Sequence, residues 1–196
     1  MLQRICIFCG SSPGADPVYT EAATSLGRHV AALGLGIVYG GSRLGLMGVV
    51  ADAALSSGGD VTGVIPRAMQ SKEIAHTGLS DLRVVESMHQ RKALMAELSD
   101  AFIALPGGFG TFDELCEILT WTQLGLQRGP CGILNVKGYY DHLLRMFDHA
   151  ENERFIKPEH RRMVISDADP ATLVNRLQGY QVPVVDKWIG RDQINL

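Results

Sequence analysis

Short apolar runs that alternate with segments of helical spacing constrain the fold of this chain more than any other feature. Six runs rich in β-branched or other apolar residues are followed by turn formers: RICIFC, GIVYG, DVTGVIP, LRVVE, AFIAL and CGILNV. Helical spacing is found near residues 17–33, 46–57, 88–99, 112–125 and 139–152. The runs lack strict apolar–polar alternation, which is typical of parallel strands covered by helices on both sides. We therefore expect an α/β fold with a doubly wound, mainly parallel sheet and helices on both faces.

Length and composition predict one domain that binds a small ligand. A chain of 196 residues can bury a substantial core, so we expect a single domain over residues 1–196, with 182–196 as a candidate C-terminal arm. A net charge of −3 and a pI near 6.0 give no broad basic surface for nucleic acid or for an anionic membrane. No apolar run is long enough to span a bilayer, and the start does not resemble a signal peptide, so we expect a cytoplasmic protein.

The cysteines do not indicate a metal or redox site. Cys6 and Cys9 form a CxxC pair, but they lie within the strand-like run RICIFC, whereas redox pairs of this kind usually open a helix. Cys116 and Cys131 stand apart on other predicted elements. We expect buried, structural cysteines, no bound metal and no organic cofactor.

Three glycine-rich loops follow predicted strands: CGSSPG, YGGSRLGLMG and LPGGFGT. The carboxyl ends of parallel strands meet at one edge of the sheet, where glycines allow backbone N–H groups to approach a phosphate. We expect a nucleotide or sugar phosphate there, although glycines that only make tight turns are the alternative. Neither GxxxxGK[ST] nor GxGxxG is present, which disfavours a triphosphate P-loop and a dinucleotide oxidoreductase. The polar connection 66–81 is expected to border the site.

Glu114 has two interpretations. Thr111 and Glu114 fit a T-x-x-E capping box, in which Thr111 caps the helix and Glu114 bonds back to its N–H. Alternatively, a bound phosphate uses the loop N–H groups, and Glu114 turns toward the ligand.

Arg91 also has two interpretations. Ser87 and Gln90 form a second candidate capping box, so Arg91 and Lys92 lie near the start of a helix. Arg91 shares a face with Leu94, so it should be partly buried, with a carboxylate or a phosphate as partner. The alternative is an arginine that extends from the helix end into solvent.

These motifs identify a family resemblance. The chain resembles the Lonely Guy (LOG) family of cytokinin riboside 5'-monophosphate phosphoribohydrolases along nearly its full length, through IFCGSSPG, VYGGSRLGLMG, VTGVIP, MHQRKALM and AFIALPGGFGTFDELCEILTWTQLG. The resemblance implies a Rossmann-like fold, a homodimer with sites near the subunit interface, and hydrolysis of an adenine-type nucleoside 5'-monophosphate to free base and ribose 5-phosphate. Proteins with these motifs have also been labelled lysine decarboxylase, which we disfavour because no lysine here has a convincing Schiff-base setting.

The resemblance also implies the site residues. Glu114 and Arg91 match the catalytic positions of the family. The positions expected to contact substrate are Lys92, Gly107, Gly108, Phe109, Gly110, Thr111, Phe112, Asp113, Glu73, Thr120, Met88 and Gly41.

Cleavage of a ribosyl N-glycosidic bond builds positive charge on the sugar, which an ionised carboxylate stabilises. We expect Glu114 either to serve the sugar in this way or to activate water, and Arg91 to fix the phosphate and orient Glu114. A non-catalytic nucleotide or cofactor carrier on the same fold, and an interaction protein with a vestigial site, are the alternatives. The motifs do not distinguish adenine from N6-prenylated adenine.

Overall fold

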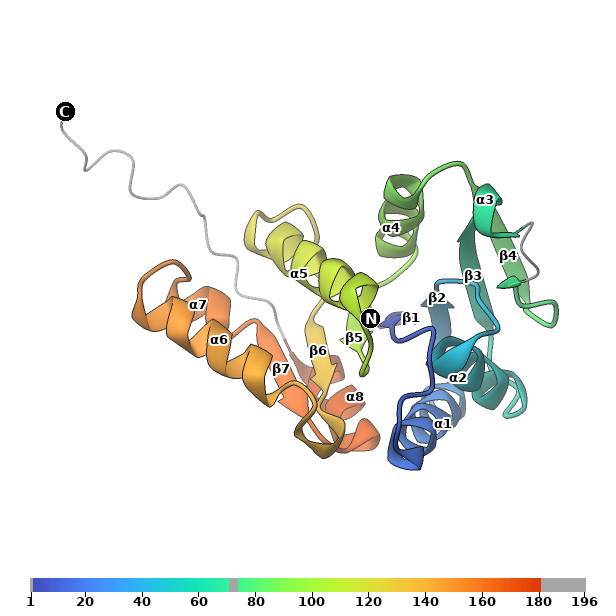
Figure 1. Cartoon of the computed structure of the whole chain (residues 1–196), viewed down its shortest axis with the longest axis horizontal. Coiled ribbons are helices and arrows are strands. Elements are labelled where there is room, and N and C mark those ends of the chain that lie inside the picture. Colours follow the sequence, from blue (N-terminus) through green and yellow to red (C-terminus); the bar gives the residue numbers. More distant parts are fainter. Residues whose placement is uncertain (1, 71–73, 181–196) are drawn as a thin grey trace.

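The computed structural model describes residues 2–70 and 74–180, which contain one seven-stranded sheet in which every pairing is parallel (Figure 1). The strands are β1 (Arg4–Phe8), β2 (Gly36–Tyr39), β3 (Val61–Pro66), β4 (Asp81–Val85), β5 (Ala101–Ala104), β6 (Cys131–Leu134) and β7 (Val164–Asp167). The helices are α1 (Pro17–Ala32), α2 (Gly45–Leu55), α3 (Arg67–Met69), α4 (Met88–Glu97), α5 (Phe109–Gln123), α6 (Asp141–Asn152), α7 (Pro158–Arg161) and α8 (Pro170–Gly179). The predicted doubly wound α/β fold is confirmed.

The order of the strands places the ligand crevice. The sheet runs β4-β3-β2-β1-β5-β6-β7, so the chain builds outward from β1 in one direction and then returns to start the other half at β5. In this topology, the loops that leave adjacent strands turn to opposite faces at the reversal and open a crevice beyond the carboxyl ends of the strands. The crevice is therefore expected beyond β1 and β5.

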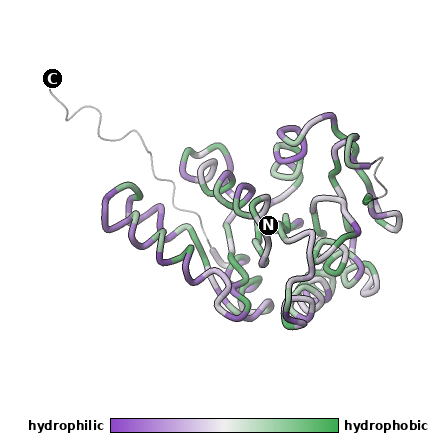
Figure 2. The backbone as a smooth tube through the Cα atoms, viewed as in Figure 1, coloured by the Kyte–Doolittle hydropathy of each residue, from purple (hydrophilic) through white to green (hydrophobic). Residues whose placement is uncertain are grey.

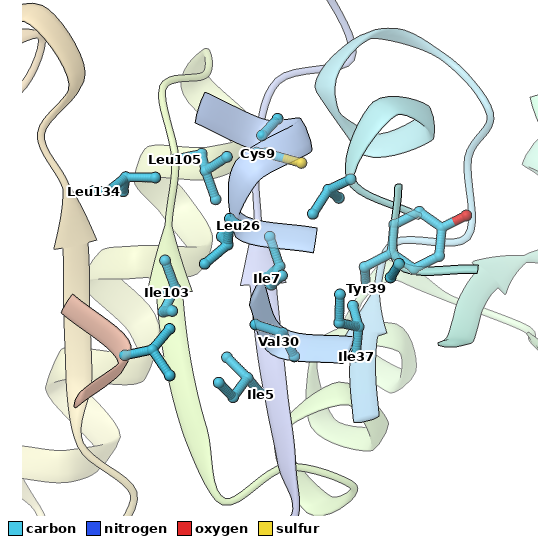
Figure 3. Packing of buried hydrophobic residues seen from close by; sticks show 14 of the residues in the cluster. Ile5, Ile7, Cys9, Leu26, Val30, Ile37, Tyr39, Ile103, Leu105 and Leu134 are labelled. Atoms are coloured by element: carbon cyan, nitrogen blue, oxygen red, sulfur yellow. The ribbon is translucent and has the colours of Figure 1, made fainter. Parts of the chain in front are cut away.

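Helices cover both faces of the sheet, as the uninterrupted apolar runs predict. On one face, α1, α2 and α8 pack on a cluster that includes Ile5, Ile7, Leu26 and Ile103 (Figure 3). On the other face, α4 and α5 pack against a second cluster around Phe102. Figure 2 shows hydrophobic residues along the central strands, whereas the outer helix α6 mixes hydrophilic and hydrophobic residues.

All six apolar runs form strands, and all five segments of helical spacing contain helices, but the last part of the described chain was not predicted. The sequence pattern did not predict strand β7, because this strand is short, contains Ser166 and Asp167 and lies at the edge of the sheet. Helix α8 begins where the Asp169 carboxylate accepts a hydrogen bond from the Thr172 N–H, just before Pro170, which is a recognisable start signal.

The structure also bears on the predictions about the cysteines and about membrane-spanning segments. The candidate arm 182–196 lies outside the described residues. Cys6, Cys9 and Cys131 are buried, as expected, whereas Cys116 on α5 is exposed, so the prediction of burial is wrong for that residue. Among the residues described, no helix is long and apolar enough to cross a membrane.

Candidate active site

A cavity of about 260 Å³ lies beyond the carboxyl ends of β1, β2 and β5. Residues from all three glycine loops line it, as predicted, together with residues of α2, α3, α4 and α5. The lining residues are Ile7, Cys9, Gly10, Ser11, Gly40, Met47, Met69, Arg91, Gly108, Phe109, Gly110, Thr111 and Glu114. The cavity therefore brings together both predicted catalytic residues and the four loop residues between Gly107 and Phe112.

Helix α5 starts earlier than the sequence predicted, so the capping box of Thr111 and Glu114 is wrong. The N-cap is Gly108, and the Phe112 N–H donates to the Gly108 carbonyl at 3.1 Å. Thr111 is already inside the first turn and is buried. No side chain caps this helix, so the N–H groups of its first turn retain donor capacity at the positive end of the helix dipole. Such an end is suited to an anion.

Glycine stands at different positions of this loop for different physical reasons. A Cβ at Gly107 would overlap the Thr111 hydroxyl, so close packing of the protein itself requires that glycine. A Cβ at Gly108 or Gly110 would meet open space, and neither residue has a positive φ. Nothing in the described protein requires glycine at these two positions, which is what a loop that admits a ligand close to its backbone would show.

Arg91 is buried in the cavity wall, with 6% of its surface exposed. Its Nε donates to the Val64 carbonyl and its Nη2 to the Gly40 carbonyl, each at 3.1 Å, while Nη1 approaches the Met88 sulfur at 3.8 Å. Burial is as predicted, but the expected carboxylate partner is replaced by backbone carbonyls of β3 and of the loop after β2. Neutral acceptors leave the charge of the guanidinium uncancelled, so it acts on the cavity.

Glu114 is partly buried in the same cavity, one turn into α5. Desolvation raises the pKa of its carboxyl to about 7, a shift that the positive charges of Arg91 and Lys92 oppose and that Asp113 reinforces. A carboxyl poised near neutrality can exchange a proton or carry charge at the pH of the cell. Its setting is that of an acid–base or charge-stabilising group.

Lys92 and Asp113 contact each other and lie outside the cavity lining. The Lys92 ammonium is 2.9 Å from the Asp113 carboxylate and 3.0 Å from the Glu117 carboxylate, and only 11% of its side chain is exposed. These ion pairs join α4 to α5, and in the sequence Lys92 directly follows Arg91 while Asp113 directly precedes Glu114. They therefore fix the two helices that carry the candidate catalytic pair.

The remaining predicted substrate contacts also lie outside the cavity lining. Met88 touches Arg91 through its sulfur, whereas Phe112 packs against the Tyr140 ring. Thr120 donates to the Cys116 carbonyl on an exposed part of α5.

Two glycines from the same predicted set are near the cavity without lining it, and one residue is not described. Gly41 has a φ of +73°, and a Cβ there would press on Ile65, so its backbone conformation and packing explain the glycine. Gly107 faces a neighbouring cavity. Glu73 lies outside the described residues.

The sequence did not single out several residues that line the cavity. Met47 and Met69 add apolar surface, and Met69 comes from the connection 66–81, which was expected to border the site. Cys9, Ser11 and Gly40 belong to the first two glycine loops. The signal for Cys9, Ser11 and Gly40 was their place next to strand ends, whereas Met47 lies in α2 and Met69 in α3, and no residue type marked any of the five individually.

The fold and the site together define a Rossmann-like α/β protein whose switch-point cavity combines an uncapped helix start, a buried arginine and a carboxyl of near-neutral pKa. A family described as "Possible lysine decarboxylase" matches residues 47–177. The chain is 49% identical to a probable cytokinin riboside 5'-monophosphate phosphoribohydrolase, LOGL9, of Oryza sativa subsp. japonica, over 93% of this chain and 80% of that protein. It is 48% identical to the cytokinin riboside 5'-monophosphate phosphoribohydrolase LOG7 of Arabidopsis thaliana, over 91% of this chain and 82% of that protein. The chain therefore belongs to the LOG family.

Solved structures of lower identity share the fold. A molybdenum cofactor binding protein from Rippkaea orientalis aligns with a TM-score of 0.69 at 20% identity, covering 91% of this chain and 96% of that one. The molybdenum cofactor carrier protein of Chlamydomonas reinhardtii aligns with a TM-score of 0.69 at 21% identity, covering 92% of this chain and all of that one. Identity at this level supports the architecture alone.

Proposed function

We propose that this protein hydrolyses the N-glycosidic bond of cytokinin riboside 5'-monophosphates, of AMP, or of both, releasing the free base and ribose 5-phosphate. The observation that carries the proposal is that Glu114, with its pKa near 7, and the buried Arg91 line one cavity with the uncapped start of α5. The names of relatives 45–49% identical to this chain support the same reaction and substrate class.

The start of α5 is the proposed phosphate site. Backbone N–H groups near Gly108 and Gly110 supply donors, the open space at these glycines admits the phosphate oxygens, and Arg91 supplies a positive charge. Arg91 has further N–H donors besides the two that bond to carbonyls, because a guanidinium has five. When the phosphate is held in this way, the ribose of the substrate extends toward Glu114.

Glu114 is proposed to act on the sugar. As the bond between C1′ and the base nitrogen breaks, C1′ gains positive charge, and the ionised Glu114 stabilises it or removes a proton from the attacking water. The water oxygen bonds to C1′, and the departing base takes up a proton. In this arrangement, the start of α5 and Arg91 bind the phosphate of the substrate, and the Glu114 carboxylate faces its sugar.

Release of free base is the test. Wild type and Glu114→Gln are incubated with AMP and with isopentenyladenosine monophosphate, and the base is quantified by chromatography. We expect release by the wild type and a loss on the order of a hundredfold or more in the variant, because glutamine fills the same space without a charge. If both proteins bind the nucleotide and neither releases base, the hydrolase proposal fails and a carrier function takes its place.

The assembly and the compartment are further parts of this proposal. The family resemblance supports a homodimer with sites near the subunit interface, and the cytoplasmic location stays a prediction from the sequence. Light scattering of the purified protein tests the dimer, since a monomer at the concentration used in the assay would contradict it.

A further inference from the structure

Two consecutive tyrosines outside the catalytic cavity hold the glycine loop that lines it. Tyr139 and Tyr140 lie in the connection between β6 and α6. The Tyr139 hydroxyl donates to the Gly107 carbonyl, and the Tyr140 hydroxyl donates to the Leu105 carbonyl at 2.6 Å. A distant part of the chain thus fixes two carbonyls of the loop that leads into α5.

The surroundings of the two tyrosines restrict their movement. Tyr140 is 1% exposed, and its N–H donates to the Asn135 side chain at 2.7 Å. The Tyr139 ring stacks on Phe112 with centroids 6.5 Å apart and meets the edge of Tyr19 at 6.0 Å. The rings therefore place their hydroxyls at defined positions, and loss of a hydroxyl alone would leave this aromatic packing in place.

The Tyr139 hydroxyl and the Gly107 carbonyl belong to residues that line a neighbouring cavity and do not line the catalytic one. The neighbouring cavity, of about 320 Å³, is lined by Tyr19, Tyr139 and Gly107, and Gly108 lines both this cavity and the catalytic one. The Gly107–Gly108 peptide is trans, so its carbonyl and its N–H point in opposite directions. A carbonyl directed at Tyr139 therefore directs the Gly108 N–H away from Tyr139, and Gly108 is the residue of this peptide that lines the catalytic cavity.

We propose that Tyr139 is a positioning residue that orients the Gly107–Gly108 peptide, so that the Gly108 N–H is presented to the phosphate of the substrate. The inference rests on the proposed function, because it assigns a donor to the phosphate of that substrate. Tyr139 belongs to the β6–α6 connection, and none of the catalytic or substrate-contact residues discussed above lies there. The hydroxyl acts through the peptide and does not itself touch the ligand.

Tyr140 provides a matched control. Its hydroxyl also binds a carbonyl of this loop, but that carbonyl belongs to the peptide between Leu105 and Pro106. Proline has no N–H, so Tyr140 has no donor to orient. Loss of either hydroxyl removes one bond to the loop, whereas only the loss at Tyr139 should release a donor aimed at the substrate.

The experiment compares Tyr139→Phe and Tyr140→Phe with the wild type in the full-length protein. Calorimetric titration with ribose 5-phosphate gives Kd, the AMP reaction gives kcat and KM, and thermal unfolding gives Tm. We expect Tyr139→Phe to weaken ribose 5-phosphate binding on the order of tenfold, as for one hydrogen bond to a charged group, and to raise KM with kcat nearly unchanged. Tyr140→Phe is expected to bind ribose 5-phosphate as the wild type does.

The outcomes separate this inference from the proposed function. If Tyr139→Phe binds ribose 5-phosphate as tightly as the wild type does, the positioning role is overturned. It is also overturned if both variants lose binding equally and in proportion to their losses in Tm. In both cases, a wild type that still releases base leaves the proposed function standing. A wild type that neither binds ribose 5-phosphate nor releases base overturns the proposed function and the positioning role together.

Discussion

Replacement of Glu114 by glutamine should stabilise the protein at alkaline pH while it removes activity. In the folded protein, desolvation raises the pKa of this carboxyl from its usual value of 4.5 to about 7. An acid with a raised folded pKa contributes stability below its unfolded pKa and loses that contribution as the pH rises through the folded value. Wild type should therefore lose stability between about pH 4.5 and 7, and glutamine, which does not ionise, should not.

The size of the effect follows from the shift. A difference of about 2.5 pKa units corresponds to about 3 kcal/mol at 1.36 kcal/mol per unit, which is an upper limit because Glu114 is partly exposed and water screens its charge. For a chain of this size, 1 kcal/mol moves Tm by about 2–4 °C. At pH 8, Glu114→Gln should therefore melt several degrees above the wild type, and at pH 4, which is below the unfolded pKa of Glu114, the two proteins should melt close together.

The assay is thermal unfolding followed by circular dichroism at both pH values, with Glu117→Gln as the control. Glu117 lies one turn further along α5 and pairs with Lys92 at 3.0 Å, so its replacement removes a favourable contact and should leave Tm at pH 8 unchanged or lower. A Glu114→Gln protein that is no more stable than the wild type at pH 8 would refute the near-neutral pKa. A stabilised but fully active variant would refute the catalytic role.

Three further predictions concern the same cavity. If ionised Glu114 is required, kcat/KM rises as the pH increases toward about 7 and then levels off, whereas a rate that falls over this range would identify a protonated, general-acid role. Lys92→Met should move this profile to higher pH, because Lys92 lowers the pKa of Glu114, and Asp113→Asn should move it to lower pH; equal shifts in one direction would contradict the electrostatic account. Gly40→Ala places a methyl group where the Arg91 Nη2 lies, so we expect kcat/KM to fall by roughly ten- to a hundredfold, and unchanged kinetics would show that Arg91 does not need this position.

The sequence was sufficient to predict the architecture and the convergence of the loops. Apolar runs such as Ala101–Leu105 have no competing interpretation once they alternate with helical segments, and parallel pairing then brings their loops to one edge. Strand β7 was missed because two of its four residues are polar, and an edge strand requires less apolar surface than a central one.

The details of the site could not be predicted, because they depend on contacts between distant residues. The acceptors of Arg91 are the carbonyls of Gly40 and Val64, and carbonyls are present at every residue, so no sequence pattern marks them. The capping box failed for a related reason. Thr111 and Glu114 have the right spacing, but Gly108 is the N-cap and α5 begins at Phe109, so Thr111 already lies inside the first turn and cannot cap it.

The choice of acceptors for Arg91 explains how the cavity can hold a positive charge and a carboxyl of near-neutral pKa together. A direct bidentate pair between Arg91 and Glu114 would lower the pKa of the carboxyl and engage the oxygens that the proposed reaction assigns to the sugar. Two neutral carbonyls instead satisfy part of the guanidinium, and Arg91 then influences Glu114 only through its charge. The remaining donors of Arg91 and the first-turn N–H groups of α5 are then left for the phosphate of the proposed substrate.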